Sequence, residues 1–210
     1  MNPSRTEPEF TIVIPTVKTN LQHHTNAILE NADLPINLII LHGHKGKPQT
    51  LNQYKLNPLN TKYTIFLDDD LIPCKDFTSQ LKTAIEQIPK PGVISFYYET
   101  EEGKAYMMYK LLEKPITHNN RIYYEAKNIN IAGGLHCIPT NLLKHTIVPD
   151  KGVKYDYSDD ASVCNQLRAL GYKNYYIKDI NNKGTTILHY TETQDYIDMK
   201  SKDLKKLRGY

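Results

Sequence analysis

The stretch Tyr63-Thr64-Ile65-Phe66-Leu67-Asp68-Asp69-Asp70-Leu71-Ile72-Pro73 joins an apolar, β-prone segment to three consecutive carboxylates and then a proline. Carboxylates this close repel one another by roughly 1 kcal/mol or more per pair, depending on the local dielectric. Such a cluster at the end of a strand indicates a neutralising cation, although a solvated acidic turn is the alternative. Oxygen ligands suit Mg²⁺ or Mn²⁺, which commonly bind together with phosphates. The stretch therefore predicts a divalent metal and a phosphorylated substrate at the end of a buried strand.

Length and composition indicate one ordinary globular domain. The chain has 210 residues, of which 40% are hydrophobic and 23% charged. We expect a cytoplasmic protein with no transmembrane segment, because no apolar run approaches roughly 20 residues and residues 1–8 lack a signal-peptide core. The net charge of +3 is too small to imply nucleic acid. Cys74, Cys137 and Cys164 are far apart, so we expect reduced thiols rather than a disulfide framework.

Hydrophobic patterning divides the first hundred residues into alternating strands and helices. We expect strands over residues 10–15, 36–41, 63–67 and 93–98, and helices over residues 20–32, 49–56 and 76–88. This alternation predicts an α/β fold with a mostly parallel sheet covered by helices. Ligands of such sheets bind outside the carboxyl ends of the strands, where the acidic triplet lies.

The second half is less regular and richer in strands. We expect strands over residues 106–112, 121–124, 128–132, 172–177 and 186–189, and helices over residues 139–145, 158–170 and 193–207. The helix over residues 158–170 has the strongest signals. Ser158 can cap it, Asp159 and Asp160 lie in its first turn, and Gly171 ends it.

Four features follow one another along the chain: a strand ending at Pro15-Thr16, the triplet Asp68-Asp69-Asp70, the turn Ile131-Ala132-Gly133-Gly134, and Asp159-Asp160 before Leu170-Gly171-Tyr172. In their order and spacing they resemble the GT-A glycosyltransferases, especially those of family 2, with the triplet as the DxD motif. The resemblance spans about residues 10 to 190. It implies a single GT-A domain, with a nucleotide-sugar-binding half over about residues 10–100. An acceptor-binding half follows over about residues 101–190, with a C-terminal helix within residues 191–210.

The resemblance implies a metal-dependent, inverting transfer of a sugar from a nucleotide-diphosphate sugar to an acceptor hydroxyl. A metal held by Asp68 and Asp70 would offset the charge that develops on the departing diphosphate. Two carboxylates one residue apart point to the same side only where the chain is extended. By the resemblance, Asp70 is the direct ligand of Mn²⁺ or Mg²⁺, Asp68 contacts ribose or metal-bound water, and Asp69 points away or supports. His189 is a further candidate ligand, although a lone histidine at a strand end is more often structural.

The acidic pair near residue 160 supplies the candidate base. By the match to the family, Asp160 is that base and Asp159 bonds the acceptor or the backbone. If Asp160 only caps the helix, Asp159 becomes the alternative base. Acidic residues also stabilise a helix N-terminus without catalysis, and the residues alone leave the two interpretations near parity. Gly133 and Gly134 let the backbone approach a ligand, although a bulge or tight turn explains them equally well.

The segment after the second strand departs from the family pattern. Family 2 members usually carry an acidic residue there that contacts the nucleobase, whereas this chain has Leu41-His42-Gly43-His44-Lys45-Gly46-Lys47. The nucleobase therefore stays open, with a UDP-sugar weakly favoured. We expect the lysines of this segment, Lys45 among them, to lie near phosphate. Pro15, Thr16 and Lys18 follow the first strand and are expected to meet the nucleotide.

Other functions stay open at this stage. A metal-dependent nucleotidyltransferase would prefer a glycine-rich phosphate loop after the first strand, and Pro15-Thr16-Val17-Lys18 is not one. A nucleotide-sugar-binding module that has lost its base would keep the fold without turnover. A saccharide, a lipid-linked sugar, a protein side chain or a hydroxylated DNA base would each fit as the acceptor. The oligomeric state is not indicated.

Overall fold

The computed structural model describes residues 7–43, 47–96, 98–99, 116–118, 121–127, 130–131, 134–149, 159–179 and 185–187. Its elements in chain order are β1 (Phe10–Thr16), α1 (Gln22–Asn31), β2 (Ile36–His42), α2 (Lys47–Leu56), β3 (Tyr63–Leu67), β4 (Leu71–Ile72), α3 (Phe77–Gln87), β5 (Pro91–Phe96), β6 (Tyr98–Glu99), β7 (Ile116–His118), β8 (Arg121–Glu125), β9 (Leu135–Pro139), the 3-10 helix η2 (Thr140–His145), α4 (Asp159–Ala169), β10 (Lys173–Asp179) and β11 (Thr185–Ile187). None of the helices described is long and apolar enough to cross a bilayer.

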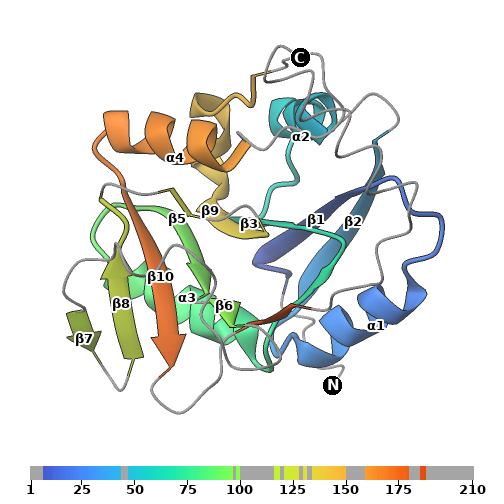
Figure 1. The fold of residues 1–210 in the computed structure, drawn as a ribbon, viewed down its shortest axis with the longest axis horizontal. Coiled ribbons are helices and arrows are strands. Elements are labelled where there is room, and N and C mark those ends of the chain that lie inside the picture. Colours follow the sequence, from blue (N-terminus) through green and yellow to red (C-terminus); the bar gives the residue numbers. More distant parts are fainter. Residues whose placement is uncertain are drawn as a thin grey trace, which may run out of the picture.

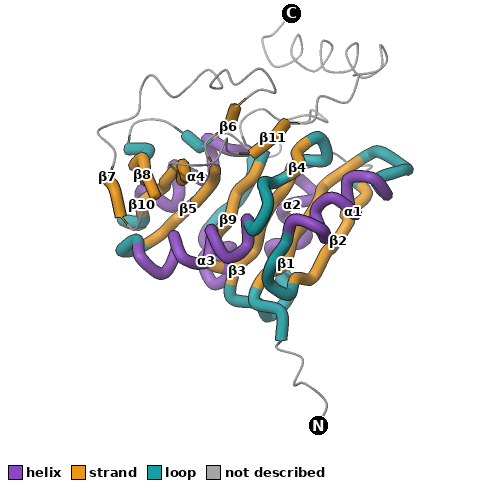
Figure 2. The backbone as a smooth tube through the Cα atoms, turned by 90° about the horizontal axis from the view of Figure 1, so that it is seen from below, coloured by secondary structure: helices purple, strands orange, loops and turns teal. Residues whose placement is uncertain are grey.

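The main sheet has eight strands in the order β2-β1-β3-β9-β5-β10-β8-β7. Strand β1 pairs in parallel with β2 and β3, and β5 with β10. Strands β9 and β8 run against their neighbours. Figures 1 and 2 show α1 and α3 on one face of this sheet and α2 and α4 on the other. The mostly parallel α/β sheet predicted from the alternation of strands and helices is thus confirmed, because crossover helices cover both faces of a parallel sheet.

A second, small sheet has the order β4-β11-β6. Its strands lie along one rim of the molecule in Figure 2. Leu71 of β4 pairs with Ile187 of β11 in antiparallel register, and β11 runs parallel to β6. Because β3 belongs to the large sheet and β4 to the small one, the three acidic residues between them connect the two sheets. This junction is where the sequence predicted the site.

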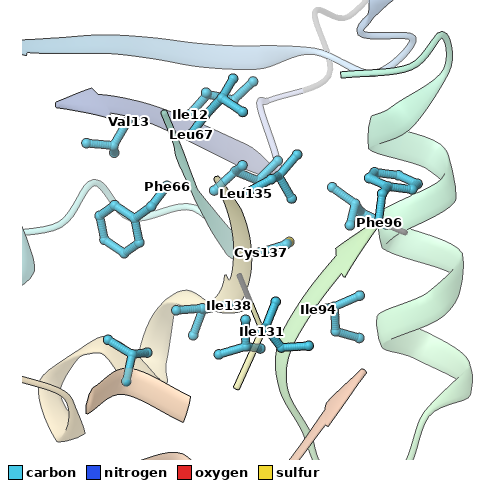
Figure 3. Packing of buried hydrophobic residues seen from close by; sticks show 14 of the residues in the cluster. Ile12, Val13, Phe66, Leu67, Ile94, Phe96, Ile131, Leu135, Cys137 and Ile138 are labelled. Carbon is cyan, nitrogen blue, oxygen red and sulfur yellow. The ribbon is translucent and has the colours of Figure 1, made fainter. Parts of the chain in front are cut away.

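The core is built around neighbouring strands of the main sheet. Ile65 of β3 lies opposite Cys137 of β9, which in turn lies opposite Ile94 of β5. All three side chains are fully buried, and Figure 3 shows Cys137 and Ile94 among the apolar side chains of this cluster. Burial raises the pKa of the Cys137 thiol far above its ordinary value. The cysteine is therefore a packing residue rather than a nucleophile.

The element predictions failed chiefly around β9. A strand was expected over residues 128–132, but Asn130 and Ile131 lie outside any strand, and the strand begins at Leu135 instead. β9 is buried over most of its length, so its sequence lacks the alternation that marks a half-exposed strand. The helix expected over residues 139–145 is the 3-10 helix η2. The predicted strand over residues 106–112, the helix over residues 193–207 and the cap Ser158 lie outside the described residues.

The N-terminus of α3 receives its cap from a distant part of the chain. Asp76 precedes the helix with a φ of 58° and makes no side-chain cap. Asp33, in the loop after α1, accepts hydrogen bonds from the Ser79 backbone N–H (3.0 Å) and from Thr78 Oγ1 (2.6 Å). Partial burial raises the pKa of Asp33, but the hydrogen bonds from Ser79 and Thr78 outweigh it and hold the pKa below its ordinary value. The carboxylate thus satisfies one orphan backbone donor of the first turn, the Ser79 N–H, as a local cap would.

Candidate functional site

The acidic triplet forms a tight turn. The Asp68 N–H donates to the Gly134 carbonyl (2.8 Å), and the Leu71 N–H donates back to the Asp68 carbonyl (3.3 Å). The expectation of an extended chain from Asp68 to Asp70 is therefore wrong, and a cation shared by the two carboxylates would be held across a turn instead. The chain leaves the large sheet at Leu67, the end of β3, and enters the small sheet at Leu71, the start of β4. Residues 68–70 turn the chain from one sheet to the other.

Asp69 ties the turn to the end of β1. Its carboxylate accepts hydrogen bonds from Thr16 Oγ1 and from Lys18 Nζ (3.1 Å), and Lys18 Nζ also donates to the Asp69 carbonyl (3.1 Å). The Lys18 backbone N–H in turn donates to Thr16 Oγ1 (2.9 Å). The Asp69 side chain is only 16% exposed. Of the two roles expected for Asp69, pointing away or supporting, this geometry favours support of the turn.

Asp68 faces the start of α2. Lys47 Nζ lies 2.8 Å from Asp68 Oδ1, and the two side chains are 22% and 33% exposed. Lys47 is the first residue of α2, within the lysine-bearing segment that was expected near phosphate. Lys45 of the same segment lies outside the described residues.

Asp70 is the member of the triplet whose carboxylate stays available. It is partly buried, and it makes no hydrogen bond or ion pair with any residue in the described ranges. Mg²⁺ is typically held by one or two carboxylates together with substrate phosphates. Asp68 and Asp70 therefore fit a divalent cation that a phosphorylated ligand helps to hold. Within the described part of the chain, no three His, Cys, Asp or Glu side chains gather into a complete metal cage.

A buried histidine, which the sequence reasoning missed, fixes the chain directly after the triplet. His24 of α1 is fully buried, and its Nε2 donates to the Leu71 carbonyl at 2.5 Å. Its Nδ1 is buried without a hydrogen-bond partner among the described residues. Burial lowers the pKa of His24 below its ordinary value, against the opposing effects of the Leu71 hydrogen bond and the Asp69 charge. The available signal was helical spacing, because His24 lies four residues before buried Ile28 on the same helix face.

A pocket lies beside Asp68, between α2 and α4. Lys55 of α2 is almost completely buried there, with Nζ 5.6 Å from the centre of the Phe66 ring. The free volume of the pocket is about 10 Å³, which is room for about one water molecule. The lining residues are Pro15, Lys47, Leu51, Lys55, Phe66, Asp68, His136, Val148 and Val163.

The structure brings together some of the predicted site residues and leaves others undescribed. Pro15 and Thr16 end β1 next to the triplet, and Gly134 contacts it through its carbonyl. Asp159 and Asp160 open α4 as predicted, and only their backbone is described. Gly133 and His189 lie outside the described residues.

The sequence matches no family model and no curated protein. Solved structures nevertheless share its fold. TarS 1-349 from S. aureus aligns with a TM-score of 0.59 and 13% identity, over 91% of this chain and 63% of TarS 1-349. The mannosyltransferase PcManGT from Pyrobaculum calidifontis, solved with GDP-Man and Mn²⁺, gives a TM-score of 0.58 and 15% identity, over 97% of this chain and 65% of PcManGT.

The chain has the GT-A fold. GalNAc-T7, solved with UDP, GalNAc and Mn²⁺, shares this fold with a TM-score of 0.55 and 11% identity, over 91% of this chain and 47% of its own. The chain thus spans less than two thirds of the length of each of these GT-A structures. At such low identity, the similarity establishes only the fold. The chemistry depends on the residues of the site.

Proposed function

We propose that this chain is a metal-dependent glycosyltransferase that moves a sugar from a nucleotide-diphosphate sugar to an acceptor hydroxyl, with inversion of configuration. The observation that carries the proposal is the acidic turn after β3 of a GT-A fold, where Asp70 makes no hydrogen bond or ion pair with the described residues. Structures of TarS with UDP-GlcNAc and of PcManGT with GDP-Man and Mn²⁺ support the donor class. In this proposal one GT-A domain binds the donor with about residues 10–100 and the acceptor with about residues 101–190.

Asp68 and Asp70, the DxD carboxylates, would hold Mn²⁺ or Mg²⁺, with donor phosphates completing the coordination. When bound, the metal would offset the negative charge that develops on the departing diphosphate. His189 is a further candidate ligand. The pairing of Ile187 with Leu71 supports it, since β11 ends beside the residue that follows Asp70. Asp69 would hold the turn against β1 through its bonds to Thr16 and Lys18.

The donor nucleotide would lie at the ends of β1 and β3. The small pocket between α2 and α4 adjoins Asp68 and marks the side of the turn on which we place the nucleoside. Pro15 and Thr16 would contact the nucleotide, and Lys18, Lys45 and Lys47 would lie near its phosphates. No acidic residue follows β2 to select uracil, so a UDP-sugar is only the first donor to test.

The acceptor hydroxyl would be deprotonated by Asp160, with Asp159 as the alternative base. An inverting single displacement needs a base on the side opposite the leaving group. Val163, one helical turn after Asp160, lines the same pocket as Asp68, which supports a place for the start of α4 beside the donor. Gly133 and Gly134 would let the backbone approach the acceptor, whether a saccharide, a protein side chain or a hydroxylated DNA base.

The deciding experiment is calorimetric titration of UDP, GDP, CDP and ADP, with and without Mn²⁺. We expect tight binding of one nucleotide only with metal, and loss of this binding in Asp70→Asn. Asp76→Asn is the matched control, because it removes the same charge from a nearby exposed residue at a φ of 58°, which asparagine tolerates. Absence of metal-dependent binding to all four nucleotides would overturn the proposal.

Turnover separates an enzyme from a binding module that has lost its base. Slow release of free sugar from the nucleotide sugar can be followed without a known acceptor. We expect Asp160→Ala to retain metal-dependent nucleotide binding and to lose this release. Unchanged release in Asp160→Ala with loss in Asp159→Ala would assign the base to Asp159 instead.

A further inference from the structure

One of the two carboxylates proposed for the metal already has a cation beside it. Lys47 Nζ lies 2.8 Å from Asp68 Oδ1, and both side chains line the pocket next to the turn. Mg²⁺ needs its oxygen ligands at about 2.0–2.1 Å. An ammonium group and a divalent cation on the same oxygen would also repel each other strongly. Lys47 and a metal therefore compete for Oδ1 of Asp68, and a metal on the other oxygen of this carboxylate would still be repelled by the nearby ammonium group.

The position of Lys47 indicates what it binds when it leaves Asp68. It is the first residue of α2, whose first turn contains no acidic residue. A positive charge at a helix N-terminus is unfavourable unless an anion lies close by. Lys47 therefore needs a negative partner in either state. A lysine side chain is flexible enough to exchange one anion for another.

We propose that Lys47 binds the diphosphate of the donor and exchanges Asp68 for it when metal and nucleotide bind together. The proposal rests on the proposed function of the site. The diphosphate draws the ammonium group away and frees the Asp68 oxygen, while a metal on Asp68 releases Lys47 toward the phosphates. Metal and nucleoside diphosphate therefore strengthen each other's binding, beyond their direct contact.

Lys18 carries the same charge as Lys47 and contacts the same turn, but its partner there is Asp69. It holds both the carboxylate and the carbonyl of Asp69, and Asp69 is occupied with Thr16 rather than proposed as a metal ligand. Removal of Lys18 changes the local charge as much as removal of Lys47 does. It frees no oxygen of Asp68. The two lysines thus form a matched pair that separates exchange at Asp68 from general electrostatics.

The test measures Mn²⁺ binding by electron paramagnetic resonance, without nucleotide and with saturating UDP or GDP, whichever binds the wild type. Thermal unfolding of each variant first verifies that it is folded. Without nucleotide, we expect Lys47→Met to bind Mn²⁺ up to about fivefold more tightly than the wild type, as the loss of a partly exposed ion pair allows. Its affinity for the nucleoside diphosphate should fall by about tenfold or more, because a charge-assisted hydrogen bond is lost.

Two further variants test the exchange. Lys18→Met should gain less Mn²⁺ affinity than Lys47→Met, and Lys47→Arg should keep the mutual strengthening of metal and nucleotide. If Lys47→Met binds Mn²⁺ no more tightly than Lys18→Met, or keeps the full mutual strengthening, the exchange is refuted. A wild type that binds Mn²⁺ and nucleotide independently refutes this inference alone. A wild type that binds neither refutes it together with the proposed function.

Discussion

Replacement of His24 by glutamine should remove a pH-dependent loss of stability below pH 6.5. His24 is fully buried with Nδ1 unpartnered among the described residues, and burial holds its pKa below the ordinary 6.5. The unfolded chain then binds a proton at pH values where the folded chain does not. The stabilisation is therefore complete above pH 6.5 and is lost as the pH falls from there toward the folded-state pKa.

The size of this pH dependence follows from the single proton that His24 binds in the unfolded chain and not in the folded chain. The slope of unfolding free energy against pH approaches at most about 1.4 kcal/mol per pH unit for a single group. Asp69 and Asp70 favour the charged imidazole and Lys18 disfavours it, but burial is the largest effect. Glutamine can still donate an N–H to the Leu71 carbonyl, and it does not titrate. The stability of the wild type relative to His24→Gln should thus decline as the pH falls.

The assay is urea unfolding of both proteins at intervals between pH 5.0 and pH 8.0. His23→Gln is the matched control, because His23 is the neighbouring residue of α1 and is exposed to solvent. We expect this control to keep the wild-type pH dependence. A difference between wild type and His24→Gln that stays constant across the range would refute the reasoning from burial.

Three other substitutions or titrations test the packing. Asp33→Ala should lower the free energy of unfolding by about 0.5–2 kcal/mol, as the loss of a helix cap does, and Asp33→Asn should retain part of it; urea unfolding measures both. Leu81→Ala should cost about 2–5 kcal/mol in the same assay, because Leu81 of α3 is fully buried, and a smaller loss would contradict its place in the core. Burial and the nearby Glu125 carboxylate raise the pKa of Tyr175 to about 12, so the Tyr175 phenol should stay largely un-ionised near pH 11, and Tyr175→Phe should lose one late-ionising phenol relative to the wild type in an ultraviolet titration.

The first half of the fold was predictable because its signals are local. The apolar run over residues 63–67 was predicted as a strand, and the structure has β3 over Tyr63–Leu67. The helix predicted over residues 158–170 is α4, and Gly171 ends it with a φ of 82°. Periodic burial and helix-end residues act within a few positions of one another, so the chain itself records them.

The failures around β9 have the opposite cause. Strand β9 runs antiparallel between β3 and β5, and its residues are almost all buried. A strand covered on both sides has no polar face, so no period of two marks it. Its location follows from the neighbours with which it pairs, and those neighbours lie far away in the sequence.

Residue chemistry alone pointed to the acidic triplet, since three adjacent carboxylates after an apolar strand indicate a cation whatever the surrounding fold. The partners of those carboxylates came from tertiary structure. Lys47 reaches Asp68, Lys18 and Thr16 reach Asp69, and the Asp68 N–H meets the Gly134 carbonyl. His24 likewise reaches Leu71 across 47 positions of the chain. Charge and hydrophobicity are properties of each residue, whereas the neighbour that neutralises or hydrogen-bonds a group exists only once strands and helices have packed.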